Sequence, residues 1–279
     1  MERDHVPATP DHPTADPIAP GSADDDGVPA LELHALTKNF GDKAAVDGVS
    51  WQVPRGSFCG LVGPNGAGKT TALSMAVGLL RPSSGTARIL GVDMWADPVE
   101  AKTHLGVLPD GLALPERLTG AELLTYWGRL RGMEREVINT RTAELLRVLE
   151  LAEAEELGTT VLEYSTGMRK KIGLATALLH SPRLLVLDEP YEAVDPVSAR
   201  VLTAILRRFV AAGGTIIISS HVMSLVETLC DRVAIMARGK VLADGTLDEV
   251  RGSRTLEDRF VELVGDRELE GEELSWLGS

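Results

Sequence analysis

A glycine-rich stretch at residues 63–71 constrains this chain more than any other feature. It fits the phosphate-loop pattern G-x-x-x-x-G-K-[ST] without a mismatch. Glycines let backbone N–H groups approach phosphate oxygens, Lys69 supplies positive charge for the β- and γ-phosphates, and Thr70 supplies a hydroxyl for Mg²⁺. The pattern therefore predicts a nucleotide-binding loop, made of Gly63, Pro64, Asn65, Gly66, Ala67, Gly68, Lys69, Thr70 and Thr71.

The sequence on either side of this loop has the expected character. Residues 57–62 form a short apolar run typical of a buried strand, and residues 72–77 are typical of a helix. A strand, a glycine loop and a helix must follow in this order, because the positive end of the helix has to face the anion. The alternative, a glycine-rich turn that matches by chance, does not explain this context.

Composition narrows the classes of protein that remain. The chain has 279 residues, of which 44% are hydrophobic, which is enough for a packed core. Its net charge is −13, which argues against general nucleic-acid binding, because that needs a basic face. Cys59 and Cys230 both fall in apolar patterns, which indicates a reducing compartment without a disulfide framework. Because no apolar run approaches the ~20 residues needed to span a bilayer, we expect a soluble, cytoplasmic chain.

Three segments can be separated by their patterns. Residues 1–28 are rich in proline and aspartate, which predicts a disordered acidic tail. Between 29 and 250, strands alternate with helices, which indicates an α/β domain with a mainly parallel sheet. A run of helical patterns at about 111–180, including a leucine stripe at 143–151, predicts a helical insert. Residues 251–279 predict an amphipathic helix and an acidic end.

Two carboxylates follow a second buried strand pattern at 184–187. In open α/β sheets, ligands bind at the carboxyl edge of such strands. Asp188 is therefore expected to hold Mg²⁺ through water, and Glu189 to polarise an attacking water. Two surface carboxylates that cap a helix are the alternative.

The segment Tyr164-Ser165-Thr166-Gly167-Met168, upstream of that strand, resembles the signature loop of the ATP-binding cassette (ABC) ATPases, which reads L-S-G-G-Q. Ser165 and Gly167 are kept, while Tyr164, Thr166 and Met168 depart from the pattern. Glycine followed by methionine is similar to the subset that serves two-component exporters of drugs, antibiotics or polymers. In the family, Ser165, Thr166, Gly167 and Met168 would meet the ATP held by a second subunit.

The resemblance extends over about residues 30–250 and implies the P-loop ABC ATPase fold, with an antiparallel β portion beside the parallel core. It implies that Phe40 stacks on adenine, with a core aromatic as the alternative. Asp195 matches the aspartate of the family's D-loop, although Tyr191-Glu192 replaces the usual small residues before it. His221 matches the switch histidine that contacts the γ-phosphate.

One position departs from the family pattern more seriously. The glutamine of the family's Q-loop would fall at Asp110, and Gln52, ahead of the phosphate loop, is the only glutamine in the chain. Related exporter ATPases often have an acidic residue here. We expect Asp110 to act near Mg²⁺, with a helix cap or a turn residue as the alternative.

These features predict the ATP-binding and ATP-hydrolysing subunit of an ABC transporter that works as an exporter. The predicted catalytic residues are Lys69, Glu189 and His221, and Thr70, Asp110 and Asp188 are predicted at Mg²⁺. The expected partners are ATP, a separately encoded transmembrane permease, and a second copy or a related cassette in an ATP-dependent head-to-tail dimer, without nucleic acid. The expected location is the cytoplasmic face of the membrane. An importer ATPase and a soluble ABC ATPase of translation or DNA repair remain as alternatives.

Overall fold

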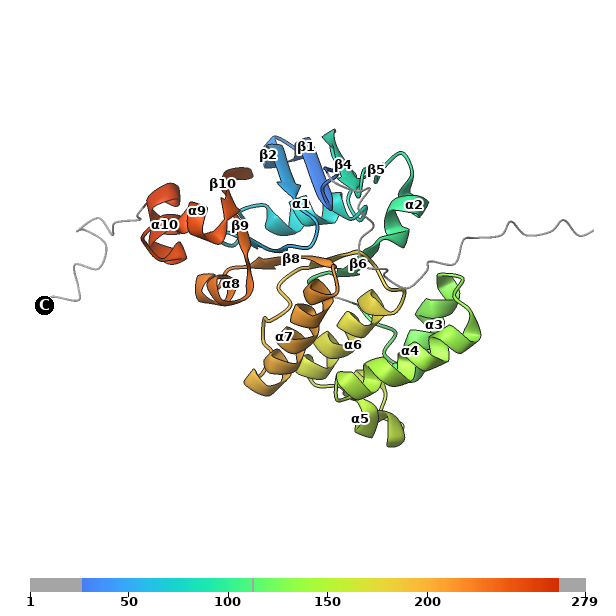
Figure 1. Cartoon of the computed structure of the whole chain (residues 1–279). Helices are drawn as coiled ribbons and strands as arrows, with labels where there is room; N and C mark the ends of the chain where they lie inside the picture. The colour runs from blue at the N-terminus through green and yellow to red at the C-terminus, as the bar shows by residue number, and fades with distance from the viewer. Residues whose placement is uncertain (1–26, 112, 266–279) are drawn as a thin grey trace, which may run out of the picture.

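In the described part of the chain, two β-sheets lie on either side of helix α1 (Lys69–Ala76), as Figure 1 shows. The computed structural model describes residues 27–111 and 113–265. The predicted N-terminal tail, apart from its last two residues, and the predicted acidic end beyond residue 265 lie outside the described residues.

The larger sheet has six strands in the order β10-β9-β3-β8-β7-β6. All neighbours pair in parallel except β9 and β10, which form the antiparallel hairpin at the edge. The prediction of a mainly parallel core is therefore confirmed. The strands are β3 (Phe58–Val62), β6 (Leu105–Leu108), β7 (Leu184–Leu187), β8 (Thr215–Ser220), β9 (Arg232–Ala237) and β10 (Lys240–Thr246).

The smaller sheet is antiparallel, in the order β2-β1-β4-β5. Leu31, Leu33 and Leu36 of its first strand are buried, and this strand is paired on both sides. This sheet is the expected antiparallel portion. Its strands are β1 (Leu31–Phe40), β2 (Lys43–Val53), β4 (Ser84–Ile89) and β5 (Val92–Asp93).

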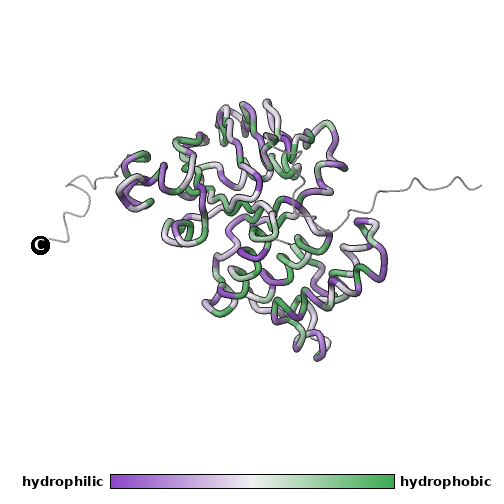
Figure 2. The backbone as a smooth tube through the Cα atoms, viewed as in Figure 1, coloured by the Kyte–Doolittle hydropathy of each residue, from purple (hydrophilic) through white to green (hydrophobic). Residues whose placement is uncertain are grey.

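Strand β7 shows why the parallel strands are apolar without interruption. Leu184 and Val186 face the core shared with α1 and the antiparallel sheet, whereas Leu185 and Leu187 face the core under the helices on the other side. Successive side chains of a strand point to opposite faces, so a sheet covered on both faces needs apolar residues at every position. Along the helices, hydrophobic and hydrophilic positions alternate (Figure 2).

Helices cover both faces of the large sheet. Residues 111–180 contain α3 (Gly120–Leu130), α4 (Arg135–Val148), α5 (Ala152–Glu156), a short 3-10 turn η1 (Val161–Glu163) and α6 (Thr166–Leu178). Thr119 caps α3 in a reciprocal capping box with Glu122. The remaining helices are α2 (Pro98–Thr103), α7 (Pro196–Ala211), α8 (Met223–Leu229), α9 (Leu247–Arg251) and α10 (Leu256–Val264).

Two helix boundaries differ from the sequence prediction. The helix after the phosphate loop begins at Lys69, ahead of the helical pattern at 72–77, because the left-handed Gly68 ends the loop there. The leucine stripe at 143–151 marks only the end of α4, which begins at Arg135. The buried positions Ile138, Thr142 and Leu146 lie four residues apart, so the buried face begins upstream of the leucines.

His180 lies between the end of α6 and the start of β7, and its Nε2 meets the carbonyl oxygen of Leu105 at 3.0 Å. Burial, with the nearby charge of Arg131, lowers the pKa of this imidazole to about 3. The unfolded chain binds the proton near pH 6.5 and the folded chain does not, so stability is present above pH 6.5 and is lost as the pH falls below it.

We therefore expect about 2 kcal/mol less stability at pH 5 than at pH 7 from this group alone, or a fall in melting temperature of roughly 4–8 °C. Thermal melts of the parent and of His180→Gln at both pH values measure the difference. An equal pH slope in both proteins would show that His180 does not contribute. His104, whose pKa burial also lowers, acts in the same direction in both proteins.

Candidate active site

The phosphate loop connects the end of β3 to the start of α1, as its pattern predicts. Gly68 has φ +103°, and α1 has no side-chain cap, so the positive end of the helix remains available to an anion. A Cβ on Gly63 would collide with the backbone oxygen of Met236, and a Cβ on Gly68 with that of Ala45. Close packing of backbone therefore requires glycine at both positions.

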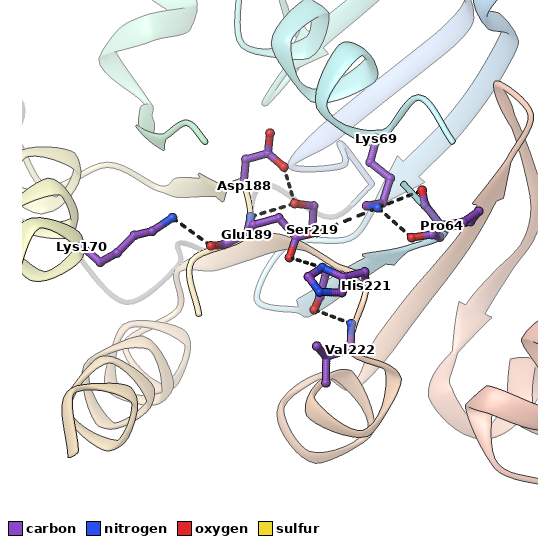
Figure 3. A network of polar contacts seen from close by, with 10 residues as sticks. Pro64, Lys69, Lys170, Asp188, Glu189, Ser219, His221 and Val222 are labelled. Atoms are coloured by element: carbon purple, nitrogen blue, oxygen red, sulfur yellow. Dashed lines mark hydrogen bonds and ion pairs between the residues drawn. The ribbon is translucent and has the colours of Figure 1, made fainter. Parts of the chain in front are cut away.

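The side chain of Lys69 is folded into the loop that precedes it. Its Nζ donates to the carbonyl oxygens of Gly63 at 2.7 Å and Pro64 at 3.3 Å, and lies 3.9 Å from Oε1 of Glu189 (Figure 3). Burial lowers the pKa of Lys69, while Glu189 and Asp188 oppose that shift. The ammonium group is thus placed between the loop and the carboxylates.

Asp188 and Glu189 follow β7 directly and meet Ser219 from the neighbouring strand β8. The Ser219 hydroxyl donates to the carboxylate of Asp188 and accepts the backbone N–H of Glu189 at 2.9 Å (Figure 3). Sequence reasoning gave Ser219 no role. The sequence feature that could have indicated Ser219 is its position two residues before His221, at the end of a buried strand. Parallel pairing of β7 and β8 places this strand end level with Asp188.

Glu189 also contacts His221, which follows β8. Its Oε2 lies 3.1 Å from Nδ1 of the imidazole (Figure 3). Glu189 has φ +45°, a conformation that is strained for a residue with a side chain and that occurs where the surroundings enforce it. The structure thus brings three predicted catalytic residues together, namely Lys69, Glu189 and His221.

These residues line an open cleft of about 730 Å³, within the size range of small-molecule sites. Phe40 lies on its wall and is 55% exposed, so the alternative of a core aromatic is wrong. Sequence reasoning did not single out Lys43 or Arg238, which line the same cleft. The predicted residues on the cleft wall are Phe40, Pro64, Asn65, Gly66, Ala67, Gly68, Lys69, Thr70, Thr71, Asp110, Glu189 and His221.

The predicted signature residues lie elsewhere. Ser165 caps α6 by accepting the N–H of Met168 at 3.2 Å, and Ser165 and Thr166 are exposed. Gly167 is buried against Asp195, whose carboxylate a Cβ at Gly167 would meet at 2.9 Å. Among the described residues that line the cleft, none belongs to 165–168 or is Asp195.

Asp195 itself caps helix α7. Its Oδ1 accepts the N–H groups of Val197 and Ser198, each at 2.9 Å, and these backbone bonds keep the pKa of the carboxyl low. Asp195 therefore stabilises a helix start in this chain, next to the start of α6.

Asp110 lies on the cleft wall, two residues after the end of β6. Its Oδ1 accepts the N–H of Gly111 at 2.9 Å, and Gly111 has φ +63°. The side chain is exposed. Asp110 thus has the hydrogen bond of a turn residue and a position that faces the cleft, so both predictions for it stay open.

The oxygen donors at this edge suit Mg²⁺. Within residues 27–111 and 113–265 no group of three or more His, Cys, Asp or Glu could hold a metal on its own. Mg²⁺ keeps several waters and substrate phosphates, so it needs only one or two protein oxygens. The hydroxyl of Thr70 and the carboxylate of Asp188, which is buried and already paired with Ser219, fit that requirement.

Comparison with known proteins agrees with this geometry. The family model described as ABC transporter matches residues 46–192. This chain belongs to the ABC transporter family. It is 37% identical to the daunorubicin/doxorubicin resistance ATP-binding protein DrrA of Streptomyces peucetius, over 80% of this chain and 67% of that protein. It is 35% identical to the linearmycin resistance ATP-binding protein LnrL of Bacillus subtilis (strain 168), over 84% and 74%.

A third relative, the Nod factor export ATP-binding protein I of Rhizobium meliloti, is 36% identical over 82% of this chain and 69% of its own length. A solved structure described as the ATP binding subunit of an ABC transporter matches with a TM-score of 0.78 at 30% identity, over 84% of this chain and 99% of that chain. The ABC ATPase fold and the prediction of an ATP-hydrolysing subunit are confirmed, and the non-transport alternatives are not favoured.

None of the helices within residues 27–111 and 113–265 has the length and hydropathy needed to cross a membrane.

Proposed function

We propose that this ABC ATPase powers export through a separately encoded membrane subunit, at the cytoplasmic face of the membrane. The names of three relatives, which refer to drug resistance and to Nod factor export, support this proposal. The Gly167-Met168 pair agrees with it. The importer alternative predicts uptake rather than efflux.

The observation that carries the proposal is that the groups suited to bind ATP lie at two separate places on the chain. The cleft holds a phosphate loop, Glu189 and His221, whereas the capped start of α6, at Ser165 and Thr166, is exposed outside it. A helix start is suited to a phosphate. Two chains placed head to tail would each complete the other's ATP site, so we propose an ATP-dependent dimer.

The proposed roles follow from the contacts. Glu189 accepts a hydrogen bond from the attacking water and takes its proton as ATP and water become ADP and phosphate. Lys69 stabilises charge on the β- and γ-phosphates, and His221 holds the carboxylate of Glu189 and reaches the γ-phosphate. Phe40 stacks on adenine. Thr70 and Asp188, with Asp110 beside them, would hold Mg²⁺, and the ion would supply positive charge that neutralises the phosphate oxygens.

Purification of the tagged chain from detergent-solubilised membranes tests the partner. We expect a hydrophobic, multi-helix protein to co-purify in stoichiometric amount, and cells that carry Glu189→Gln in place of the parent to accumulate the exported compound. Ribosomes or DNA in place of a membrane protein would contradict the proposal. Lower accumulation in the mutant cells would favour import.

Asp110→Asn separates the two predictions for this residue. The change keeps the size and the turn hydrogen bond but removes the charge. If Asp110 acts near the metal, ATP affinity should stay nearly the same while the Mg²⁺ concentration for half-maximal hydrolysis rises several-fold. The measurement is the ATPase rate against Mg²⁺ concentration, and superimposable curves for parent and mutant would leave Asp110 as a turn residue only.

A further inference from the structure

A lysine of the signature helix α6 holds the backbone of Glu189 in the same chain. The Nζ of Lys170 donates to the carbonyl oxygen of Glu189 at 2.9 Å, across the gap between α6 and the end of β7 (Figure 3). We propose that Lys170 is a positioning residue, which ties the proposed general base to α6 and transmits the position of that helix to the base.

The basic residues on either side of Lys170 have other partners, so the contact with Glu189 is specific to Lys170. An α-helix turns about 100° per residue, so consecutive side chains point in different directions. Arg169 reaches Glu116 at 3.3 Å, and Lys171 reaches Glu150 at 3.1 Å. Lys170, half-buried between them, has no carboxylate within ion-pair distance among the described residues, and donates to a backbone oxygen instead.

The backbone of Glu189 depends on such support. Its φ of +45° is strained, and the residue precedes Pro190, which further limits its conformation. Its N–H donates to Ser219 at 2.9 Å, and its carbonyl oxygen accepts the N–H of Glu192 at 3.2 Å as well as the ammonium of Lys170. The side chain is held separately by His221. Loss of Lys170 removes one of these three contacts to the backbone of Glu189.

The position of Lys170 on α6 gives the contact a second consequence. The helix begins at Thr166, little more than one turn before Lys170, so a shift of its first turn also moves the ammonium group. This step rests on the proposed head-to-tail dimer, in which the first turn of α6 meets ATP bound to the other chain. ATP seated there then influences Glu189 of the adjacent site, so Lys170 links the two ATP sites.

Lys170→Met tests the positioning role in the full chain. We expect kcat to fall about tenfold because the base is misplaced, while KM and the affinity for a non-hydrolysable ATP analogue change less than about twofold. Lys170→Arg, which can still donate to the carbonyl, should recover most of the rate. Arg169→Met removes one positive charge from the same turn and should keep the parent kcat. An unchanged kcat in Lys170→Met would overturn the proposal, as would a change confined to KM.

A double-mutant cycle asks whether Lys170 acts through Glu189. In a Glu189→Gln background, Lys170→Met should cause no further loss of the residual rate, whereas an additional tenfold loss would overturn the positioning role.

The proposed link between the two ATP sites is tested by measuring the ATPase rate against ATP concentration. Lys170→Met should lower the Hill coefficient of this curve toward one. A coefficient equal to that of the parent would overturn the link. Failure of the dimer itself appears separately, as a Glu189→Gln protein that stays monomeric with ATP.

Discussion

Glu189→Gln should slow ATP hydrolysis by about 10²-fold or more while ATP binding is retained. The amide keeps the shape of the side chain and can still face His221, but it cannot take a proton from water. Because hydrolysis normally ends the ATP-bound state, the mutant should accumulate as an ATP-bound dimer. Turnover measured with Mg-ATP, and size-exclusion chromatography with and without ATP, report the two effects.

Glu192→Gln is a matched control for this experiment. Glu192 is an exposed carboxylate on the wall of the same cleft, three residues further along the same turn. The substitution removes the same charge nearby and keeps the backbone N–H that Glu192 donates to Glu189. It should keep most of the parent rate and remain monomeric. If Glu189→Gln hydrolyses ATP as fast as the parent, Glu189 is not the base, and the strained backbone at this position needs another explanation.

Lys69→Ala should nearly abolish ATP binding and hydrolysis. The β- and γ-phosphates would lose a charge-assisted contact, whose typical value of about 1.5–3 kcal/mol corresponds to roughly 10- to 150-fold weaker binding. Lys69 is 7% exposed and its ammonium group lies between the loop carbonyls and Glu189, so the substitution removes positive charge from the middle of the site. Titration with a fluorescent ATP analogue, together with the rate, measures the loss.

Two controls make the Lys69 result specific. Lys102→Ala removes a lysine from α2, outside the cleft, and should leave both binding and turnover as in the parent. Melting temperatures of both variants show whether the fold survives. Normal affinity for the analogue in a folded Lys69→Ala protein would refute the assignment of the phosphate loop.

The phosphate loop and the core strands were predictable from sequence because the information for them is local. Gly63 to Thr71 are contiguous, and the loop needs only a strand before it and a helix after it. The uninterrupted apolar runs at β7 and β8 likewise report burial on both faces without any knowledge of neighbours. The family resemblance then supplied Phe40 and His221, which do line the same cleft as the loop.

Only the tertiary structure decided which side chains meet. Ser219 reaches Asp188 and Glu189 because β8 pairs in parallel beside β7, with Leu187 opposite Ile218. No pattern within either strand indicates the register in which β7 and β8 pair.

The contact between Lys170 and Glu189 arises in the same way. Lys170 and Glu189 are nineteen residues apart in the chain, and the turn of the chain between α6 and β7 brings them together. Sequence periodicity indicates which face of α6 is buried. It does not indicate that the ammonium group of Lys170, at the edge of that face, donates to the carbonyl oxygen of Glu189. The sequence by itself therefore determined the fold and the chemistry of the nucleotide loop, while packing between distant elements determined how the catalytic carboxylate is held.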